Sequence, residues 1–123
     1  MLTHKILIVE DDPDTRHLLD VRLRANGYDT AFAEDAYMAV STAIKEPPDL
    51  ILLDLGLPAG GGFAVLERLQ AQTTTATIPV IVASAGERSS NEVRARKAGA
   101  RAYLQKPIDA AELLAAIQHA LGE

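Results

Sequence analysis

The chain has 123 residues, a formal net charge of -5, 48% hydrophobic and 24% charged residues, and no cysteine. This composition is typical of a soluble globular protein, and the length fits one domain over residues 1–123 with a sizeable core. The lack of cysteine excludes disulfides and thiolate zinc sites and is compatible with a cytoplasmic protein. The acidic balance disfavours direct binding of nucleic acid, and no apolar segment has the roughly 18 residues that a membrane helix needs.

Five segments rich in apolar residues predict the strands of a sheet. Residues 6–9 (ILIV) form a continuous apolar run that ends at acids, a pattern typical of a parallel strand buried on both faces. Residues 28–32 are less apolar and fit an edge strand. The other three runs each lead to a polar residue: 50–53 before Asp54, 80–83 before Ser84, and 102–104 shortly before Lys106.

Helical patterns lie between these strands. Asp12, followed by proline, predicts the N-cap of a helix that Gly27 ends. Asp35 and Asp109 predict two further N-caps, and Gly99 predicts the end of a helix with basic residues in its last turn. Apolar residues recur at helical intervals in two segments: Ala36, Ala39, Val40, Ala43 and Ile44, and then Leu113, Leu114, Ile117 and Leu121.

The alternation of five strands with five helices indicates parallel βαβ units with right-handed crossovers. Helices then cover both faces of the sheet. The expected fold class is therefore α/β, a doubly wound five-stranded parallel sheet flanked by five helices in three layers. The strand order 2-1-3-4-5 is taken over from flavodoxin-like sheets, in which it is common.

Polar side chains follow the predicted strands at the edge where such sheets bind ligands. They are Glu10, Asp11, Asp12, Asp54, Ser84 and Lys106. Taken singly, Asp12 also fits a simple helix cap, Ser84 a hydrogen-bonded strand end, and Lys106 a solvated surface lysine. Taken together, the clustered carboxylates repel one another unless a cation or a raised pKa relieves the repulsion, and Mg2+ is the natural cation because it prefers such oxygen ligands.

This set of side chains suits nucleophilic attack by a carboxylate on phosphorus, which forms an acyl phosphate. Asp54 would need no general base, because an ionised carboxylate is already nucleophilic. Mg2+ and Lys106 would neutralise the phosphoryl oxygens, and the Ser84 hydroxyl would contact one of them.

Four motifs in fixed order carry a resemblance that covers essentially the whole chain. They are ILIVEDD at 6–12, LILLDLGLP at 50–58, PVIVASA at 79–85, and Lys106-Pro107. With these motifs the chain resembles the receiver domain of two-component response regulators, in particular the single-domain chemotaxis-receiver type.

The resemblance implies a role for each matching residue. Asp54 would be the phosphoacceptor, and the Lys106-Pro107 peptide bond would be cis. The implied Mg2+ ligands are Asp11, Asp54 and the backbone carbonyl of Gly56, with Glu10 acting through water, and the implied phosphoryl contacts are Ser84 and Lys106.

The resemblance also implies a signalling switch rather than an enzyme that turns over. A histidine kinase or a histidine phosphotransfer protein would supply the phosphoryl group. Ser84 would then move toward it and Tyr103 would turn inward, changing the surface of the fourth helix, fifth strand and fifth helix, where a downstream protein binds. Phosphorylation could also drive homodimerisation. Without the family, Tyr103 is simply an amphipathic residue on an edge strand.

Two departures from the family pattern concern glycine. Residues 59–62 (AGGG) stand where relatives often have Asp-Gly, which predicts a mobile loop without a cap carboxylate. Gly56 and Gly86 flank the site where many relatives carry larger side chains, and we expect water to reach the aspartyl phosphate and hydrolyse it fairly fast.

Two readings from other classes share part of this evidence. One is a phosphatase or phosphotransferase with an aspartate nucleophile, although such enzymes carry a second Asp two residues later, where this chain has Gly56. The other is a binding module that has lost phosphorylation. The sequence does not distinguish a stand-alone receiver from one excised from a longer regulator, nor does it identify the kinase, the target, the oligomeric state or the lifetime of the phosphorylated form.

Overall fold

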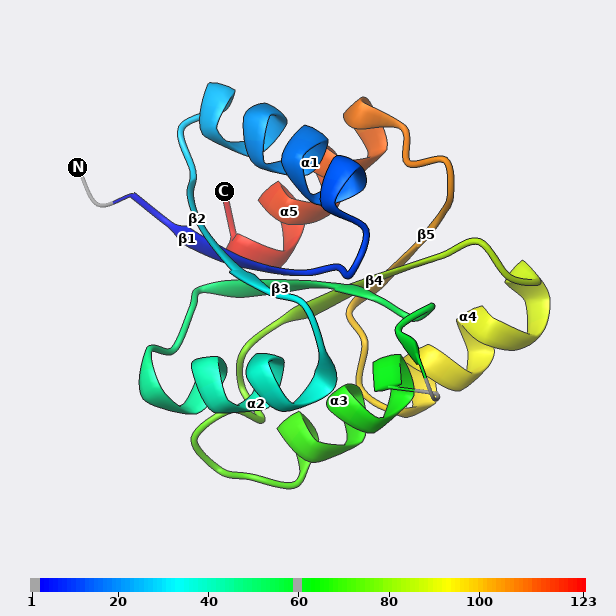
Figure 1. Cartoon of the computed structure of the whole chain (residues 1–123). Coiled ribbons are helices and arrows are strands. Elements are labelled where there is room, and N and C mark those ends of the chain that lie inside the picture. Colours follow the sequence, from blue (N-terminus) through cyan, green and yellow to red (C-terminus); the bar gives the residue numbers. More distant parts are fainter. Residues whose placement is uncertain (1–2, 59–60) are drawn as a thin grey trace.

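A computed structural model of the chain describes residues 3–58 and 61–123. Strands and helices alternate along the chain (Figure 1). In order they are β1 (Lys5–Val9), α1 (Pro13–Ala25), β2 (Asp29–Ala33), α2 (Ala36–Lys45), β3 (Leu50–Asp54), α3 (Gly61–Gln70), β4 (Val80–Ser84), α4 (Arg88–Lys97), β5 (Ala102–Gln105) and α5 (Ala110–Leu121). In the described part of the chain, every helix is too short or too polar to span a bilayer.

The sheet is parallel, with strand order β2-β1-β3-β4-β5, as predicted. Figure 1 shows α1 and α5 on one face and α2, α3 and α4 on the other. The continuous apolar strands contribute buried side chains to both faces of the sheet, because alternate side chains point to opposite sides. Ile6 and Ile8 pack in the cluster with α1 and α5, whereas Leu7 and Val9 pack in the cluster with the other three helices.

The helix boundaries follow the predicted capping residues. Asp12, Asp35 and Asp109 each accept a hydrogen bond from the backbone N–H three residues later, which satisfies a donor at the helix start. Gly27 and Gly99 have φ angles of 88° and 108°, the left-handed conformation in which glycine ends a helix without strain. The second strand begins one residue later than predicted, because the Tyr28 N–H donates to the carbonyl of Leu23 in α1 and not to a neighbouring strand.

The prediction of a mobile loop over residues 59–62 is partly wrong. Ala59 and Gly60 lie outside the described residues, as does the prediction about a cap carboxylate, but Gly61 and Gly62 begin α3. The reason is close packing. A Cβ added to Gly62 would lie 2.5 Å from Cα and 2.7 Å from the carbonyl oxygen of Leu55. Gly62 therefore lets α3 approach the backbone that follows β3, next to the candidate site.

Replacement of Gly62 by alanine tests this close approach. We expect Gly62→Ala to lower the free energy of unfolding by about 2 kcal/mol, since the Leu55 backbone has to move. Gly61→Ala is the matched control, because its Cβ would lie 3.3 Å from the Leu57 Cβ and meets no backbone outside its own helix. Urea unfolding of both variants measures the difference, and equal losses would contradict the packing explanation.

Candidate functional site

The sheet register brings the predicted polar residues to one edge. Val9 pairs with Leu53, and Asp54 pairs with Ala83, so the strands end at the same level. Ser84 pairs with Gln105, which places Lys106 beside the end of β4. The carboxyl ends of the strands thus gather the side chains that the sequence singled out, because parallel strands all point the same way.

Three carboxylates form the acidic part of the site. Glu10 and Asp54 are buried and Asp11 is exposed. One carboxylate oxygen from each of the three lies within 4.8 Å of the others. Such a set of hard oxygen donors fits a divalent cation that prefers oxygen ligands, Mg2+ above all, and the cation would relieve the mutual repulsion.

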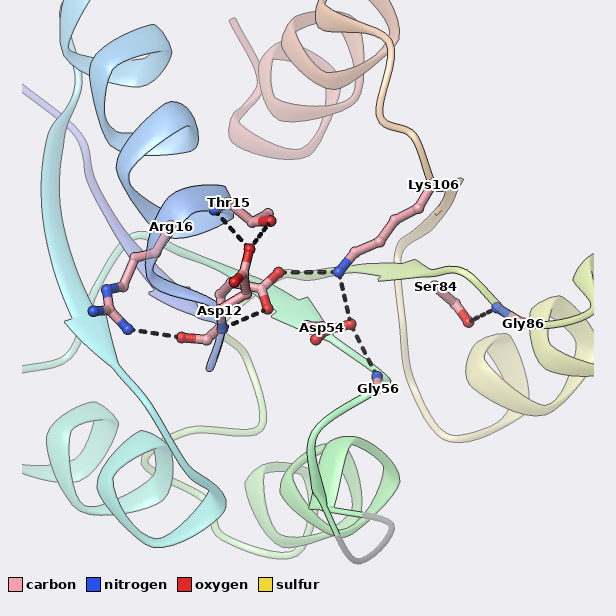
Figure 2. A network of polar contacts seen from close by, with 9 residues as sticks. Asp12, Thr15, Arg16, Asp54, Gly56, Ser84, Gly86 and Lys106 are labelled. Carbon is pink, nitrogen blue, oxygen red and sulfur yellow. Dashed lines mark hydrogen bonds and ion pairs between the residues drawn. The ribbon is translucent and has the colours of Figure 1, made fainter.

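Lys106 opposes this negative charge directly. Its Nζ lies 3.0 Å from Glu10 Oε1 and 3.2 Å from Asp54 Oδ1 (Figure 2). The Lys106 backbone N–H donates to the carbonyl of Ser84, which fixes the residue against β4, and the Lys106-Pro107 peptide bond is cis as predicted. The simple reading of Lys106 as a solvated lysine is therefore wrong.

The pKa values of the paired groups reflect burial and charge. Burial raises the pKa of Glu10 and the negative charge of Asp54 adds to this, although the hydrogen bond from Lys106 acts in the opposite direction. For Lys106, burial by itself would lower the pKa, but the hydrogen bond to Glu10 and the charge of Asp54 outweigh it, and the pKa is raised. Lys106 is consequently a full positive charge at neutral pH.

Asp12 lies next to the acidic cluster but serves the helix. Its carboxylate accepts hydrogen bonds from both the backbone N–H and the hydroxyl of Thr15, and these bonds lower the pKa of Asp12 (Figure 2). Its own backbone N–H donates to Glu10 Oε2 at 3.2 Å. The reading of Asp12 as an N-cap is confirmed, and its further contribution is to orient Glu10.

The Ser84 hydroxyl is buried and faces the loop that follows β4. Its Oγ accepts a hydrogen bond from the Gly86 N–H at 3.0 Å and lies 3.4 Å from the Asn91 side-chain amide. Figure 2 shows the hydroxyl directed toward Gly86 and away from Asp54. Ser84 thus shares the edge with Asp54 but makes its hydrogen bonds with a different segment.

Two glycines lie beside Asp54 and Ser84. The Gly56 N–H donates to Asp54 Oδ1 at 2.9 Å, and a Cβ on Gly56 would lie 3.2 Å from that oxygen. A Cβ on Gly86 would lie 2.6 Å from Asn91 Nδ2 and 3.4 Å from Ser84 Oγ. The space beside Gly86 is therefore taken by the end of the Asn91 side chain.

These groups line a cleft of about 480 Å³, in which the predicted site residues meet two that the sequence did not point to. Phe63 comes from α3 and Asn91 from α4. The Arg94 guanidinium stacks 3.7 Å from the centre of the Phe63 ring. Neither residue follows a strand, so only the packing of α3 and α4 could reveal them.

Tyr103 lies on the edge strand β5 but is not half-exposed. The residue is 4% exposed and belongs to the buried cluster on the α2, α3 and α4 face. The hydroxyl donates to Gln105 Oε1 at 3.2 Å, and the Arg88 guanidinium lies 5.7 Å from the ring centre. The ring is already inward, and its movement on phosphorylation stays a prediction.

Comparison with known proteins assigns the family. Residues 6–118 match the model of the response regulator receiver domain. The chain is 34% identical over 117 residues to the protein PilH of Pseudomonas aeruginosa, covering 95% of this chain and 97% of PilH. It is 39% identical over 114 residues to the DNA-binding regulator RpaA of Synechocystis, covering 93% of this chain and 47% of RpaA. The chain thus spans about half the length of RpaA and nearly all of PilH.

Solved structures agree with this assignment. A response regulator of Chloroflexus aurantiacus has a TM-score of 0.93 at 30% identity, covering 99% of this chain and 100% of that one. The receiver domain of a sensor histidine kinase from Pseudomonas aeruginosa, with a magnesium ion coordinated in its active site cleft, has a TM-score of 0.89 at 30% identity and the same coverage. With its strand order and its motifs, the chain belongs to the family of response regulator receiver domains.

Proposed function

We propose that the chain is one receiver domain over residues 1–123 that acts as a phosphorylation-dependent switch with Asp54 as phosphoacceptor. The observation that carries this proposal is the placement of Asp54 at the end of β3, 3.2 Å from the Lys106 ammonium and within the oxygen cluster of Glu10 and Asp11. The phosphoryl donor is a phosphohistidine of a sensor kinase or a phosphotransfer protein, as the family assignment supports.

The proposed transfer needs no base and no proton from the protein. A carboxylate oxygen of Asp54 forms a bond to phosphorus while the bond from phosphorus to the imidazole nitrogen breaks, and the nitrogen leaves with the electron pair. Lys106 balances negative charge on the phosphoryl oxygens, and the Gly56 N–H holds Asp54 in position. Each phosphoryl group stays on the protein until hydrolysis or a partner removes it, so the chain acts as a stoichiometric switch.

In this proposal Mg2+ is held by Asp11, Asp54 and the backbone carbonyl of Gly56, and Glu10 acts through water. The cluster of oxygens within 4.8 Å supports this assignment. The bound ion would supply positive charge to the phosphoryl oxygens. The chain's part is to supply hard oxygen donors at a fixed edge, with Glu10 oriented by the N–H of Asp12.

We further propose that the downstream protein binds the surface formed by α4, β5 and α5. Ser84 and Tyr103 transmit the change, because they lie on the adjacent strands β4 and β5. The α4 helix carries four basic residues, of which Arg88 and Arg96 pair with Glu92 and Arg94 stacks on Phe63 of α3. Homodimerisation on phosphorylation belongs to the same proposal, whereas direct contact with nucleic acid and insertion into a membrane do not.

The first experiment is intact mass spectrometry after incubation with acetyl phosphate. We expect one phosphoryl adduct that requires both Mg2+ and the Asp54 carboxylate, and therefore none in Asp54→Asn. Asp14→Asn, which removes an exposed carboxylate in the first turn of α1, is the charge-matched control and should react normally. No adduct under any condition would support a binding module without phosphorylation, and steady turnover of a generic phosphomonoester would support a phosphatase.

Binding of Mg2+ should stabilise the folded chain. At a concentration of about 100 times its dissociation constant, the ion adds about 2.7 kcal/mol to the free energy of unfolding. We expect Asp11→Asn to lose most of this gain and Asp14→Asn to keep it. Urea unfolding with and without Mg2+ measures the effect, and an unchanged gain in Asp11→Asn would remove that residue from the ligand set.

Gly86 contributes no side chain to its side of the cleft, so water should reach the aspartyl phosphate and hydrolyse it rapidly. We expect Gly86→Leu to displace Asn91, fill this side and slow hydrolysis by roughly threefold to tenfold, a barrier increase of about 1 kcal/mol. The decay of the mass adduct after removal of acetyl phosphate measures the rate. The hydrolysis rate of Gly86→Ala should lie between those of the wild type and Gly86→Leu. A rate that does not depend on side-chain size would refute the open access of water to the aspartyl phosphate.

A further inference from the structure

A side-chain amide at the end of β5 connects Tyr103 with the loop that follows Ser84. Gln105 is half-buried and pairs with Ser84 in the sheet register. Its Nε2 donates to the Gly86 carbonyl at 3.0 Å, and its Oε1 accepts from the Tyr103 hydroxyl at 3.2 Å. The amide nitrogen thus binds the loop that follows β4, and the amide oxygen binds the Tyr103 side chain on β5.

Gly86 is therefore held through both of its backbone polar groups. Its carbonyl accepts from Gln105, and its N–H donates to Ser84 Oγ at 3.0 Å. Asn91 supports the same hydroxyl from α4 at 3.4 Å. A continuous hydrogen-bonded chain runs from Tyr103 through Gln105 and Gly86 to Ser84, and it ends on a hydroxyl that points away from Asp54 (Figure 2).

We propose that Gln105 is a positioning residue that holds the β4–α4 loop and thereby keeps the Ser84 hydroxyl turned away from Asp54, which slows uptake of the phosphoryl group. This inference rests on the proposed function, in which Ser84 contacts the phosphoryl oxygens. To do so, the Ser84 side chain has to rotate toward Asp54, and this rotation carries its oxygen away from the Gly86 N–H, which now lies 3.0 Å from it (Figure 2). Every contact that fixes Gly86 in its present place therefore favours the arrangement that is not ready to react.

The hydrogen bond from Gln105 to Gly86 sets the size of the effect. A neutral hydrogen bond within a protein changes an equilibrium by about twofold to tenfold. Since Gln105 is half-buried, water compensates for part of the loss, and we expect the lower half of this range. The fraction of molecules with Ser84 released rises by this factor when the amide is removed, and the rate of uptake rises with it.

The variant that tests this proposal is Gln105→Met, which keeps the length of the side chain and removes both the donor and the acceptor. We expect the rate of adduct formation with acetyl phosphate and saturating Mg2+, followed by intact mass, to rise about threefold. Gln118→Met makes the same chemical change at an exposed position on α5 and should leave the rate unchanged. Thermal unfolding of each variant checks that the fold is intact.

Two further measurements separate positioning from a general effect on structure. The backbone amide resonance of Gly86 should shift in Gln105→Met and stay in place in Gln118→Met. Tyr103→Phe removes only the hydroxyl that orients the amide and should accelerate uptake less than Gln105→Met does. If the wild type forms the adduct but Gln105→Met reacts at an unchanged or lower rate, the role of Gln105 is refuted and the proposed function stands. If the wild type forms no adduct, the proposed function is refuted as well.

Discussion

The site depends on the balance between clustered carboxylates and one ammonium group. Glu10 and Asp54 are buried at neighbouring strand ends, where their like charges repel in a medium less polar than water. Lys106 lies within 3.2 Å of both and offsets this cost. A site held together in this way suits a divalent cation and, in the proposed function, a phosphoryl group, because each supplies a charge that the existing groups can pair with.

Close packing around the acidic edge determines how much room the reacting groups have. Gly62 allows α3 to approach the chain just after Asp54, and Gly56 places no side chain against the Asp54 carboxylate. Phe63 and Asn91 complete the cleft from two helices that the sheet itself does not place. The predicted reacting groups therefore come from strand ends, while the helices on one face complete the cleft beside them.

The hydrogen-bonded chain through Gln105 gives a physical route from the site to the edge of the sheet. Tyr103 is buried and Ser84 is buried, yet the group between them is a half-buried amide that exchanges partners at modest cost. Such a connection suits the proposed switch, because it is held by a few hydrogen bonds that can be exchanged without repacking the core.

By itself the sequence determined the strand ends and hence most of the site. Continuous apolar runs followed by Glu10, Asp54 and Ser84 are typical of buried parallel strands, whose polar residues meet at one edge, and the capping residues delimited the helices. Tertiary structure alone decided the rest. It placed Gly62 in a helix, buried Tyr103, and brought Asn91 and Gln105 to the Ser84 loop. These features depend on how separate elements pack, and no local periodicity records a contact between residues that are distant in the chain.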